Sequence, residues 1–344
     1  MPKLIVQIPC FNEEETLART IADVPREIEG LSKVEILVID DGSTDRTAEI
    51  AQEAGADFLI QNGSNIGLAQ SFQRGLDACL ARGADIIVNT DGDNQYNGAD
   101  IPALVQPILE GRADIVVGDR QTDQINHFGP LKRFLQKAGS QMVSGLADAE
   151  IHDAVSGFRA FSRRAAMGVT VRSTFSYTTE TLIQAGRKRL RIASTPVRTN
   201  EVTRPSRLFR SIPHFLMRTG RTMLRVFAMY EPLKIFTALG ALLMLAGAAP
   251  IARFLFHYMS GDGAGMIQSL ILGGVLFLAG GFCVMFALIA DLIAYNRQLL
   301  ELTLERVRKI EYAMNEERSQ VLGRRRFPTK KLRDELDTIA ARLR

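Results

Sequence analysis

The stretch Asn89-Thr90-Asp91-Gly92-Asp93-Asn94-Gln95 follows directly on the run Asp85-Ile86-Ile87-Val88. The run predicts a buried strand, and the stretch places two carboxylates just beyond its end. Alternate residues of an extended segment point to the same side, so Asp91 and Asp93 face one ligand and Gln95 continues the series. Carboxylates this close repel each other unless a cation neutralises them. Mg²⁺ or Mn²⁺ does so with oxygen ligands, and usually shares its shell with substrate phosphates. An acidic turn after a strand is the alternative.

Short apolar runs and helical patterns alternate through the first half of the chain. Such alternation is typical of an α/β fold with a mostly parallel sheet and helices on both faces. In such sheets ligands bind beyond the carboxyl ends of the strands. The predicted strands are Leu4–Pro9, Glu35–Ile39, Phe58–Ile60, Asp85–Val88 and Ile115–Val117, and the predicted helices cover Glu13 to about Glu29, Thr44–Ala54, about Gln70 to Arg82 and a segment from Asp100.

Polar residues follow several of these strands. Pro9–Glu13 follows the first strand, Asp40–Asp45 the second and Gly118–Arg120 the fifth, so we expect them to converge on one edge of the sheet. The adjacent aspartates Asp40 and Asp41 leave a carboxylate to spare for a nucleobase or a ribose hydroxyl. A turn followed by a helix N-cap from the next hydroxyl side chains explains the same residues. A dinucleotide-binding domain is disfavoured because the first turn lacks Gly-x-Gly-x-x-Gly.

The 344 residues are 46% hydrophobic and carry a formal net charge of +4. This length favours more than one domain. The three cysteines, Cys10, Cys79 and Cys283, have no paired spacing, which argues against a disulfide framework or a zinc site. Basic residues gather near the carboxyl terminus, for example at Arg324–Arg326, where we expect contact with anionic lipid. Nucleic acid is the competing interpretation of this charge, but nothing else in the sequence supports it, and no nucleic-acid partner is expected.

Six motifs occur in order: Ile8-Pro9 with Asn12-Glu13, Asp40-Asp41-Gly42-Ser43-Thr44-Asp45, Asn65-x-Gly67, Asp91-Gly92-Asp93-x-Gln95, Gly118-x-Arg120 and Asp153-x-x-Ser156-Gly157-Phe158-Arg159. Together they resemble family 2 glycosyltransferases with the GT-A fold, a Rossmann-like α/β fold. They most resemble the polyprenyl-phosphate branch, which includes dolichol-phosphate mannose synthase and bacterial undecaprenyl-phosphate glucosyltransferases. The resemblance covers residues 3 to about 230 closely. It departs from that branch at Asp119, where a serine is usual.

The resemblance implies inverting, metal-dependent transfer of a single sugar from a nucleotide-diphosphate sugar to a polyprenyl phosphate, with Mg²⁺ or Mn²⁺ as cofactor. It also implies a role for each matching residue. Catalytic roles fall to Arg120 and to Asp153, which either is a general base or orients Arg159 or the acceptor. The nucleotide-sugar would be bound by Pro9, Asn12, Glu13, Asp40, Asp41 and Asp91, the metal by Asp91, Asp93 and Gln95, and the acceptor phosphate or diphosphate by Arg133, Arg159, Arg204 and Arg207.

Two segments have the pattern of amphipathic helices with a cationic side. Between Phe128 and Leu146 apolar residues share one face, and Arg133 lies with other polar residues on another. Residues 204–230 place basic side chains at steps of three and four, and Pro213 divides this segment. Basic amphipathic helices are typical of a membrane interface. Ordinary surface helices with solvated charges are the alternative.

Two longer apolar stretches follow, at about 233–256 and 267–293. Each exceeds the roughly 20 residues needed to cross a bilayer, which predicts a transmembrane hairpin, with a buried core hairpin as the alternative. The linker 257–266 contains no Lys or Arg, whereas both flanks are basic. The positive-inside rule therefore predicts a multi-pass protein of the inner (cytoplasmic) membrane with its catalytic domain and both termini in the cytoplasm. Small residues that would allow close helix contact are Gly240, Ala241, Gly247, Ala248, Gly273, Gly274, Gly280 and Gly281.

An apolar stripe from Leu300 to Met314 predicts one tail helix over 297–318, which serves either oligomerisation or packing on the catalytic domain. A homo-oligomer is expected. The predicted organisation is a GT-A catalytic domain over 1–203, membrane-interface helices over 204–232, two transmembrane helices within 233–296 and a cytoplasmic helical tail over 297–344.

Two other functions fit part of the sequence. A processive polysaccharide synthase has a similar catalytic domain, but it carries a Gln-x-x-Arg-Trp motif and more spans, and this chain has no tryptophan. A non-catalytic membrane scaffold that binds nucleotide-sugar or lipid is disfavoured by the intact set Asp91-x-Asp93-x-Gln95.

Overall fold

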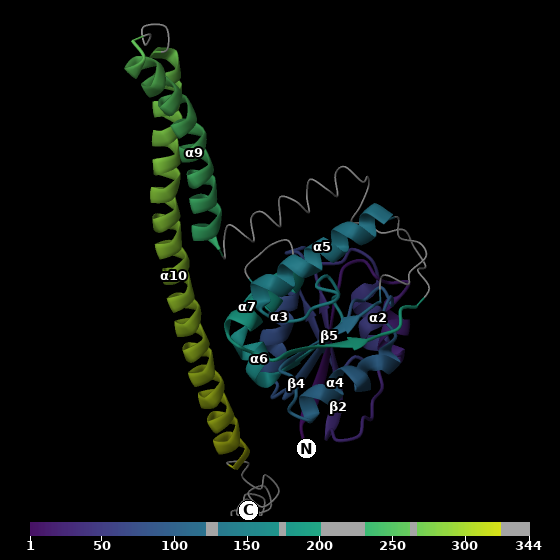
Figure 1. Cartoon of the computed structure of the whole chain (residues 1–344). Helices are drawn as coiled ribbons and strands as arrows, with labels where there is room; N and C mark the ends of the chain where they lie inside the picture. The colour runs from purple at the N-terminus through teal and green to yellow at the C-terminus, as the bar shows by residue number, and fades with distance from the viewer. Residues whose placement is uncertain (122–129, 172–176, 201–230, 262–266, 325–344) are drawn as a thin grey trace, which may run out of the picture. The chain divides into compact units, whose positions relative to one another are not determined.

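The computed structural model describes residues 1–121, 130–171, 177–200, 231–261 and 267–324. The chain divides into two compact units. The first is formed by Met1–Glu201 with Leu304–Arg344, and the second by Val202–Thr303. A central sheet organises the first unit, and two long apolar helices organise the second (Figure 1).

The first unit contains the strands β1 (Lys3–Cys10), β2 (Lys33–Asp40), β3 (Phe58–Gln61), β4 (Ile86–Asn89), β5 (Ile115–Asp119), β6 (Arg159–Ser162) and β7 (Ile192–Pro196). They form one seven-stranded sheet in the order β3-β2-β1-β4-β6-β5-β7. Strand β6 runs antiparallel to its neighbours β4 and β5, and every other neighbouring pair is parallel. The predicted α/β class with a mostly parallel sheet is therefore confirmed.

Helices flank this sheet (Figure 1). They are α1 (Leu17–Ala22), α2 (Thr47–Glu53), α3 (Leu68–Ala81), α4 (Ile101–Leu109), α5 (Pro130–Ala147), α6 (Arg163–Gly168) and α7 (Tyr177–Arg187), with a short 3₁₀ turn, η1 (Gly98–Asp100), before α4. The mostly apolar sequences of the central strands β1 and β4 suit a sheet that is covered on both faces. Leu4, Val6 and Ile8 of β1 lie in one buried cluster with apolar residues of α1 and α4.

Two predicted helices are shorter than the sequence pattern suggested. The prediction of a helix from Glu13 to about Glu29 is wrong, because α1 spans only Leu17–Ala22. Pro25 accounts for the early end, since a proline disfavours helical backbone at the residue before it. The helix predicted from Thr44 begins at Thr47 instead.

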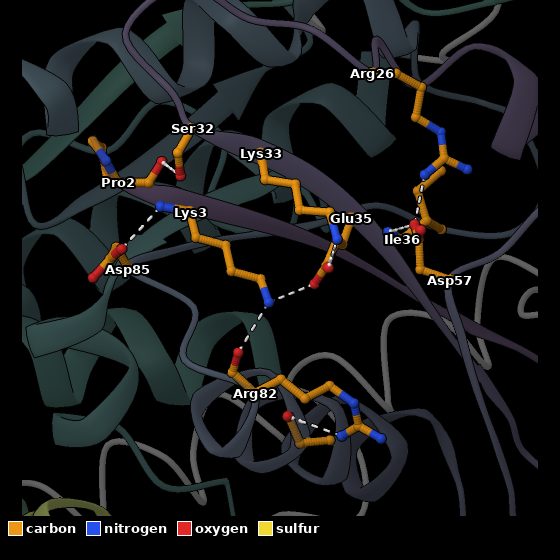
Figure 2. A network of polar contacts seen from close by, with 11 residues as sticks. Pro2, Lys3, Arg26, Ser32, Lys33, Glu35, Ile36, Asp57, Arg82 and Asp85 are labelled. Carbon is orange, nitrogen blue, oxygen red and sulfur yellow. Dashed lines mark hydrogen bonds and ion pairs between the residues drawn. The ribbon is translucent and has the colours of Figure 1, made fainter. Parts of the chain in front are cut away.

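A network of charged side chains lies at the end of the sheet where β1 and β2 begin (Figure 2). The Lys3 Nζ lies 2.6 Å from the Glu35 Oε2 and donates a hydrogen bond of 3.0 Å to the Arg82 carbonyl. The Lys3 backbone N–H donates to Asp85 at 2.8 Å. These contacts join the starts of β1 and β2 to the chain entering β4, so they fix the strands at the edge opposite the candidate site.

The second unit contains α9 (Pro232–Met259) and most of α10 (Ile267–Arg324). Both helices contain a segment long and apolar enough to cross a membrane, and the mean hydropathy of the 18-residue window in that segment is 2.0 in α9 and 2.4 in α10. Most of their large apolar side chains are exposed. Exposed apolar side chains of this number suit a lipid environment, and two consecutive helices of this length could form a hairpin there.

Four of the predicted small residues lie where α9 and α10 touch. A Cβ added to Gly240 would lie 2.8 Å from the Gly280 carbonyl oxygen, and one added to Gly247 would lie 2.7 Å from that of Gly273. The reciprocal contacts are equally close. The absence of side chains at these four positions therefore allows the backbones to meet. Gly274 and Gly281 have open space at the Cβ position instead.

The second apolar stretch was predicted over 267–293 and the tail helix over 297–318, and the structure joins both in one helix. Helix α10 runs without interruption from Ile267 to Arg324. No glycine or proline occurs between Gly281 and Gly323, so nothing in the sequence ends a helix there. Within the first unit, the Glu305 carboxylate of this helix lies 2.7 Å from the Lys188 Nζ. The domain boundaries and the oligomeric role of the tail stay predictions.

Candidate active site

Three loops meet at the carboxyl edge of the sheet because β2, β1 and β4 are neighbours and parallel. The loop after β1 carries Asn12 and Glu13, the loop after β2 begins at Asp41, and the loop after β4 carries Asp91 and Asp93. The sheet topology thus brings together the residues that the sequence predicted at this edge.

Asn12 ties the first two loops to each other. It has a positive φ of 54°, a conformation that asparagine tolerates better than most residues. Its backbone N–H donates to the Ser43 hydroxyl at 2.9 Å, and its side-chain oxygen accepts from the Thr44 backbone N–H at 2.9 Å. The Glu13 backbone N–H donates to the Thr47 hydroxyl at 2.8 Å. The predicted nucleotide contact of Asn12 would therefore be made from a loop that is hydrogen-bonded to the neighbouring loop.

The two adjacent aspartates have different surroundings, although each is only 3% exposed. Among the described residues, the Asp40 carboxylate accepts one hydrogen bond, from the Ser43 backbone N–H at 2.9 Å. Asp41 accepts three, from the Asn62 amide and from the backbone N–H groups of Ile66 and Gly67, at 2.8 to 3.0 Å. The Asp41 carboxylate therefore shapes the 62–67 loop, whereas the Asp40 carboxylate has fewer hydrogen-bond partners among the described residues.

Asp91 has an unsatisfied carboxylate oxygen. Its Oδ1 is buried and has no hydrogen-bond partner among the described residues. Burial, reinforced by the nearby Asp93 carboxylate, raises the pKa of Asp91 to about 7, while the Arg120 guanidinium opposes the rise. In the next turn the Asp93 carboxylate accepts from the Gln95 backbone N–H at 3.2 Å. A buried oxygen without a partner costs free energy unless a ligand or cation compensates it.

This donor set fits a divalent cation. Asp91 and Asp93 supply carboxylate oxygens, and Gln95 supplies a neutral amide oxygen. The described residues contain no group of three or more His, Cys, Asp or Glu side chains that could hold a metal by themselves. Mg²⁺ and Mn²⁺ commonly use one or two carboxylates and take their remaining ligands from phosphate and water. The residues present therefore fit an ion that is shared with a phosphorylated ligand.

Arg120 and Asp153 form a two-bond ion pair. The Arg120 Nε donates to one carboxylate oxygen at 2.7 Å and its Nη2 donates to the other at 3.0 Å. The Asp153 side chain is 1% exposed and that of Arg120 is 18% exposed. Both Asp153 oxygens are thus engaged by the same guanidinium. This geometry favours the predicted orienting role of Asp153 over that of a general base, with Arg120 rather than Arg159 as its partner.

Arg159 lies in the core. It has no exposed surface, and it donates to the carbonyls of Ser156, Ala154 and Thr178 at 2.5 to 2.8 Å. Burial lowers its pKa to about 10. A buried side chain whose donors are taken by backbone carbonyls does not reach a substrate phosphate, so the predicted phosphate contact is not what the structure shows. We infer that Arg159 instead fixes the chain that leads into β6.

The remaining predicted arginines have no described side chains. Arg133 lies on α5, and Arg204 and Arg207 lie outside the described residues, as does the whole basic segment 204–230. Sequence reasoning also missed a set of polar residues directly behind Asp91, namely Gln7, Asn89, Tyr96 and Tyr177. The available signal was the presence of Gln7 and Asn89 within otherwise apolar strands.

The fold is shared with solved structures. Glucosyl-3-phosphoglycerate synthase from Mycobacterium tuberculosis, solved in complex with Mn²⁺, UDP-glucose and phosphoglyceric acid, superposes with a TM-score of 0.52. The match is 22% identical and covers 66% of this chain and 79% of that chain. At this identity the likeness shows the fold alone.

Comparison with related sequences identifies the protein family. Residues 5–169 match the family model described as Glycosyl transferase family 2. The dolichyl-phosphate hexose transferase of Haloferax volcanii is 31% identical over 194 residues, which are 56% of this chain and 81% of that protein. Glycosyltransferase AglJ of the same organism is 34% identical over 194 residues, which are 55% of this chain but only 60% of that protein.

The mostly parallel sheet with its reversed strand β6 has the GT-A fold. The chain belongs to glycosyl transferase family 2.

Proposed function

We propose that this chain transfers one sugar from a nucleotide-diphosphate sugar to a polyprenyl phosphate, with inversion at the anomeric carbon. One observation carries the proposal. A family 2 glycosyltransferase unit and two helices long and apolar enough to cross a membrane lie on the same chain. Such a chain suits an acceptor whose hydrocarbon tail stays in the bilayer. The name of the dolichyl-phosphate hexose transferase among its relatives supports the same acceptor class.

The donor would bind at the carboxyl edge of the sheet. Asp91, Asp93 and Gln95 would hold Mg²⁺ or Mn²⁺, and when bound this ion offsets the charge that builds on the leaving diphosphate. The unsatisfied Asp91 Oδ1 supports this assignment. Pro9, Asn12, Glu13 and Asp40 would border the nucleotide, and Asp41 would act indirectly by shaping the neighbouring loop.

The acceptor phosphate would be its own nucleophile. Its oxygen attacks the anomeric carbon and forms the new C–O bond, while the bond from that carbon to the diphosphate oxygen breaks and the diphosphate leaves with the electron pair. A phosphate monoester has a second pKa of about 6, so the acceptor is already ionised near neutral pH and needs no base. This chemistry is consistent with an Asp153 whose two oxygens are both bonded to Arg120.

The cationic side chains would then compensate the charge of two phosphorylated substrates. Arg120 is held rigidly by Asp153 and lies close enough to oppose the pKa rise of Asp91, so it would face the diphosphate. Arg133, Arg204 and Arg207 belong to basic amphipathic segments of the sequence, and they would meet the acceptor phosphate at the membrane interface.

The charge pattern of the sequence supports one orientation in the membrane. The segments before α9 and after the apolar part of α10 are rich in Lys and Arg, whereas the linker between the helices has none. By the positive-inside rule the catalytic unit and both termini would be cytoplasmic.

Transfer in membranes tests this function. Membranes that contain the full chain are incubated with radiolabelled nucleotide-sugars and polyprenyl phosphate, and the label is followed into the organic phase. We expect one labelled lipid that carries a single sugar and that is not formed in chelator. Label in a polymer would indicate a processive synthase, and no acceptor-dependent label with any nucleotide-sugar would indicate a scaffold.

A further inference from the structure

A buried hydrogen-bond network lies directly behind Asp91. Asn89, the last residue of β4, donates from its side-chain amide to the Gly157 carbonyl at 2.8 Å and to the Tyr177 hydroxyl at 3.1 Å. The Asn89 side-chain oxygen accepts from the Gln7 amide at 2.9 Å. On the other side of the same glycine, the Gly157 backbone N–H donates to the Tyr96 hydroxyl at 3.0 Å. Both polar groups of Gly157 are therefore held by buried side chains.

Gly157 presses against the Asp91 carboxylate. A Cβ added to it would lie 2.7 Å from the Tyr177 hydroxyl and 2.9 and 3.1 Å from the two Asp91 carboxylate oxygens. The Asp91 Oδ1 has no hydrogen-bond partner among the described residues. The direction of this oxygen is therefore set by the groups against which it packs, and Gly157 is one of them.

The Tyr96 ring, whose hydroxyl accepts from Gly157, and the Tyr177 ring, whose hydroxyl accepts from Asn89, are themselves fixed by stacking. The Tyr96 ring stacks on Phe158 with ring centroids 5.0 Å apart, and the Tyr177 ring stacks on Phe72 with centroids 4.1 Å apart. Stacked, buried rings have little rotational freedom, so their hydroxyls are held at fixed points. The network is thus rigid from β1 and α3 through to the glycine.

We propose that Asn89, Tyr96 and Tyr177 are positioning residues that hold the Gly157 backbone against Asp91 and so set the direction of its free carboxylate oxygen. The catalytic part of this inference rests on the proposed function, in which that oxygen faces the metal–diphosphate. The packing part does not depend on any ligand. Groups that position a reacting ligand act through geometry, so displacements of about 1 Å can cost roughly a hundredfold in rate.

A ligand-free double-mutant cycle tests the packing. Thermal unfolding of the full chain in detergent is measured for Gly157→Ala, Asp91→Ala and the double variant, with Gly145→Ala as a control because its Cβ position is open. We expect Gly157→Ala to lower the unfolding midpoint less in the Asp91→Ala background than in the wild type, since the alanine removes one of the two groups that the new Cβ meets. Strictly additive effects would overturn the proposal, whether or not the protein transfers sugar.

Tyrosine-to-phenylalanine variants test the positioning. Tyr96→Phe and Tyr177→Phe keep the stacked rings and remove only the hydroxyls. Tyr258→Phe is the control because Tyr258 is 65% exposed in the second unit. We expect Tyr96→Phe and Tyr177→Phe to lower kcat about tenfold or more with an unchanged KM for polyprenyl phosphate. Mn²⁺ affinity, measured by electron paramagnetic resonance with UDP and GDP as probes, should fall in the same two variants. Wild-type kcat and Mn²⁺ affinity in both variants would overturn the positioning role, whereas a wild type without transfer activity would refute only the proposed function.

Discussion

Replacement of Asp153 by asparagine should destabilise the protein strongly. The Asp153 carboxylate is 1% exposed and accepts hydrogen bonds of 2.7 and 3.0 Å from an Arg120 side chain that is 18% exposed. Removing one partner of a buried ion pair typically costs about 3–5 kcal/mol. Asparagine keeps one acceptor oxygen and Arg120 retains some access to water, so we expect about 3 kcal/mol. For a unit of this size that corresponds to a fall of roughly 6–12 °C in the unfolding midpoint.

Thermal unfolding of the full chain in detergent measures this loss, with Glu110→Gln as the control because its ion pair with Arg112 is at the surface. The double variant Arg120→Gln/Asp153→Asn removes both charges and should recover much of the stability while its transfer activity stays low, since the guanidinium is gone. If Asp153→Asn abolished transfer but left the midpoint within about 1 °C of wild type, a difference below about 0.5 kcal/mol, Asp153 would be a base and not the anchor of Arg120.

Three further predictions concern other parts of the chain. In chelator the contribution of Asp91 to stability should fall as the pH rises from about 4 to about 7, because folded Asp91, with a pKa of about 7, retains a proton that the unfolded chain loses near pH 4. The unfolding midpoint of Asp91→Asn should therefore rise relative to that of the wild type over this range, and a constant difference between the two would refute the assignment to Asp91. Gly247→Ala should lower the stability of the helical hairpin, whereas Gly274→Ala, where the Cβ position is open, should not. Equal effects of the two variants in differential scanning calorimetry would contradict the contact between Gly247 and Gly273. In intact cells Ser260→Cys should react with an impermeant thiol reagent and Arg318→Cys only after lysis, and the reverse pattern would overturn the cytoplasmic assignment.

The sequence predicted the parts of the fold that depend on local pattern. The apolar runs of β1, β2 and β4 and the amphipathic pattern of α3 are long enough to identify by themselves. Strands β6 and β7 were not predicted, because Arg159–Ser162 and Ile192–Pro196 are short and contain small or polar residues. Their pairing comes from the neighbouring strands, and no local pattern records it.

The candidate site shows the same division. Asp91 and Asp93 could be placed at the carboxyl edge because they directly follow a recognisable strand. The Arg120–Asp153 pair could not be predicted, since it depends on β6 lying antiparallel beside β5. That reversal brings the end of β5, which Arg120 follows, next to the start of β6, which Asp153 precedes. The burial of Arg159 and the full use of Asp41 by the 62–67 loop are likewise tertiary facts.

The acceptor preference of the purified full chain tests the central claim most directly. The chain is incubated with Mn²⁺, radiolabelled nucleotide-sugars and either polyprenyl phosphate or phosphoglyceric acid, a ligand named for the structural neighbour. The variant Asp93→Asn is assayed in parallel, with and without chelator. We predict that label enters the lipid as a single sugar, that phosphoglyceric acid receives none, and that Asp93→Asn loses most of the transfer. Transfer to phosphoglyceric acid with none to the lipid, or full activity of Asp93→Asn in chelator, would contradict it.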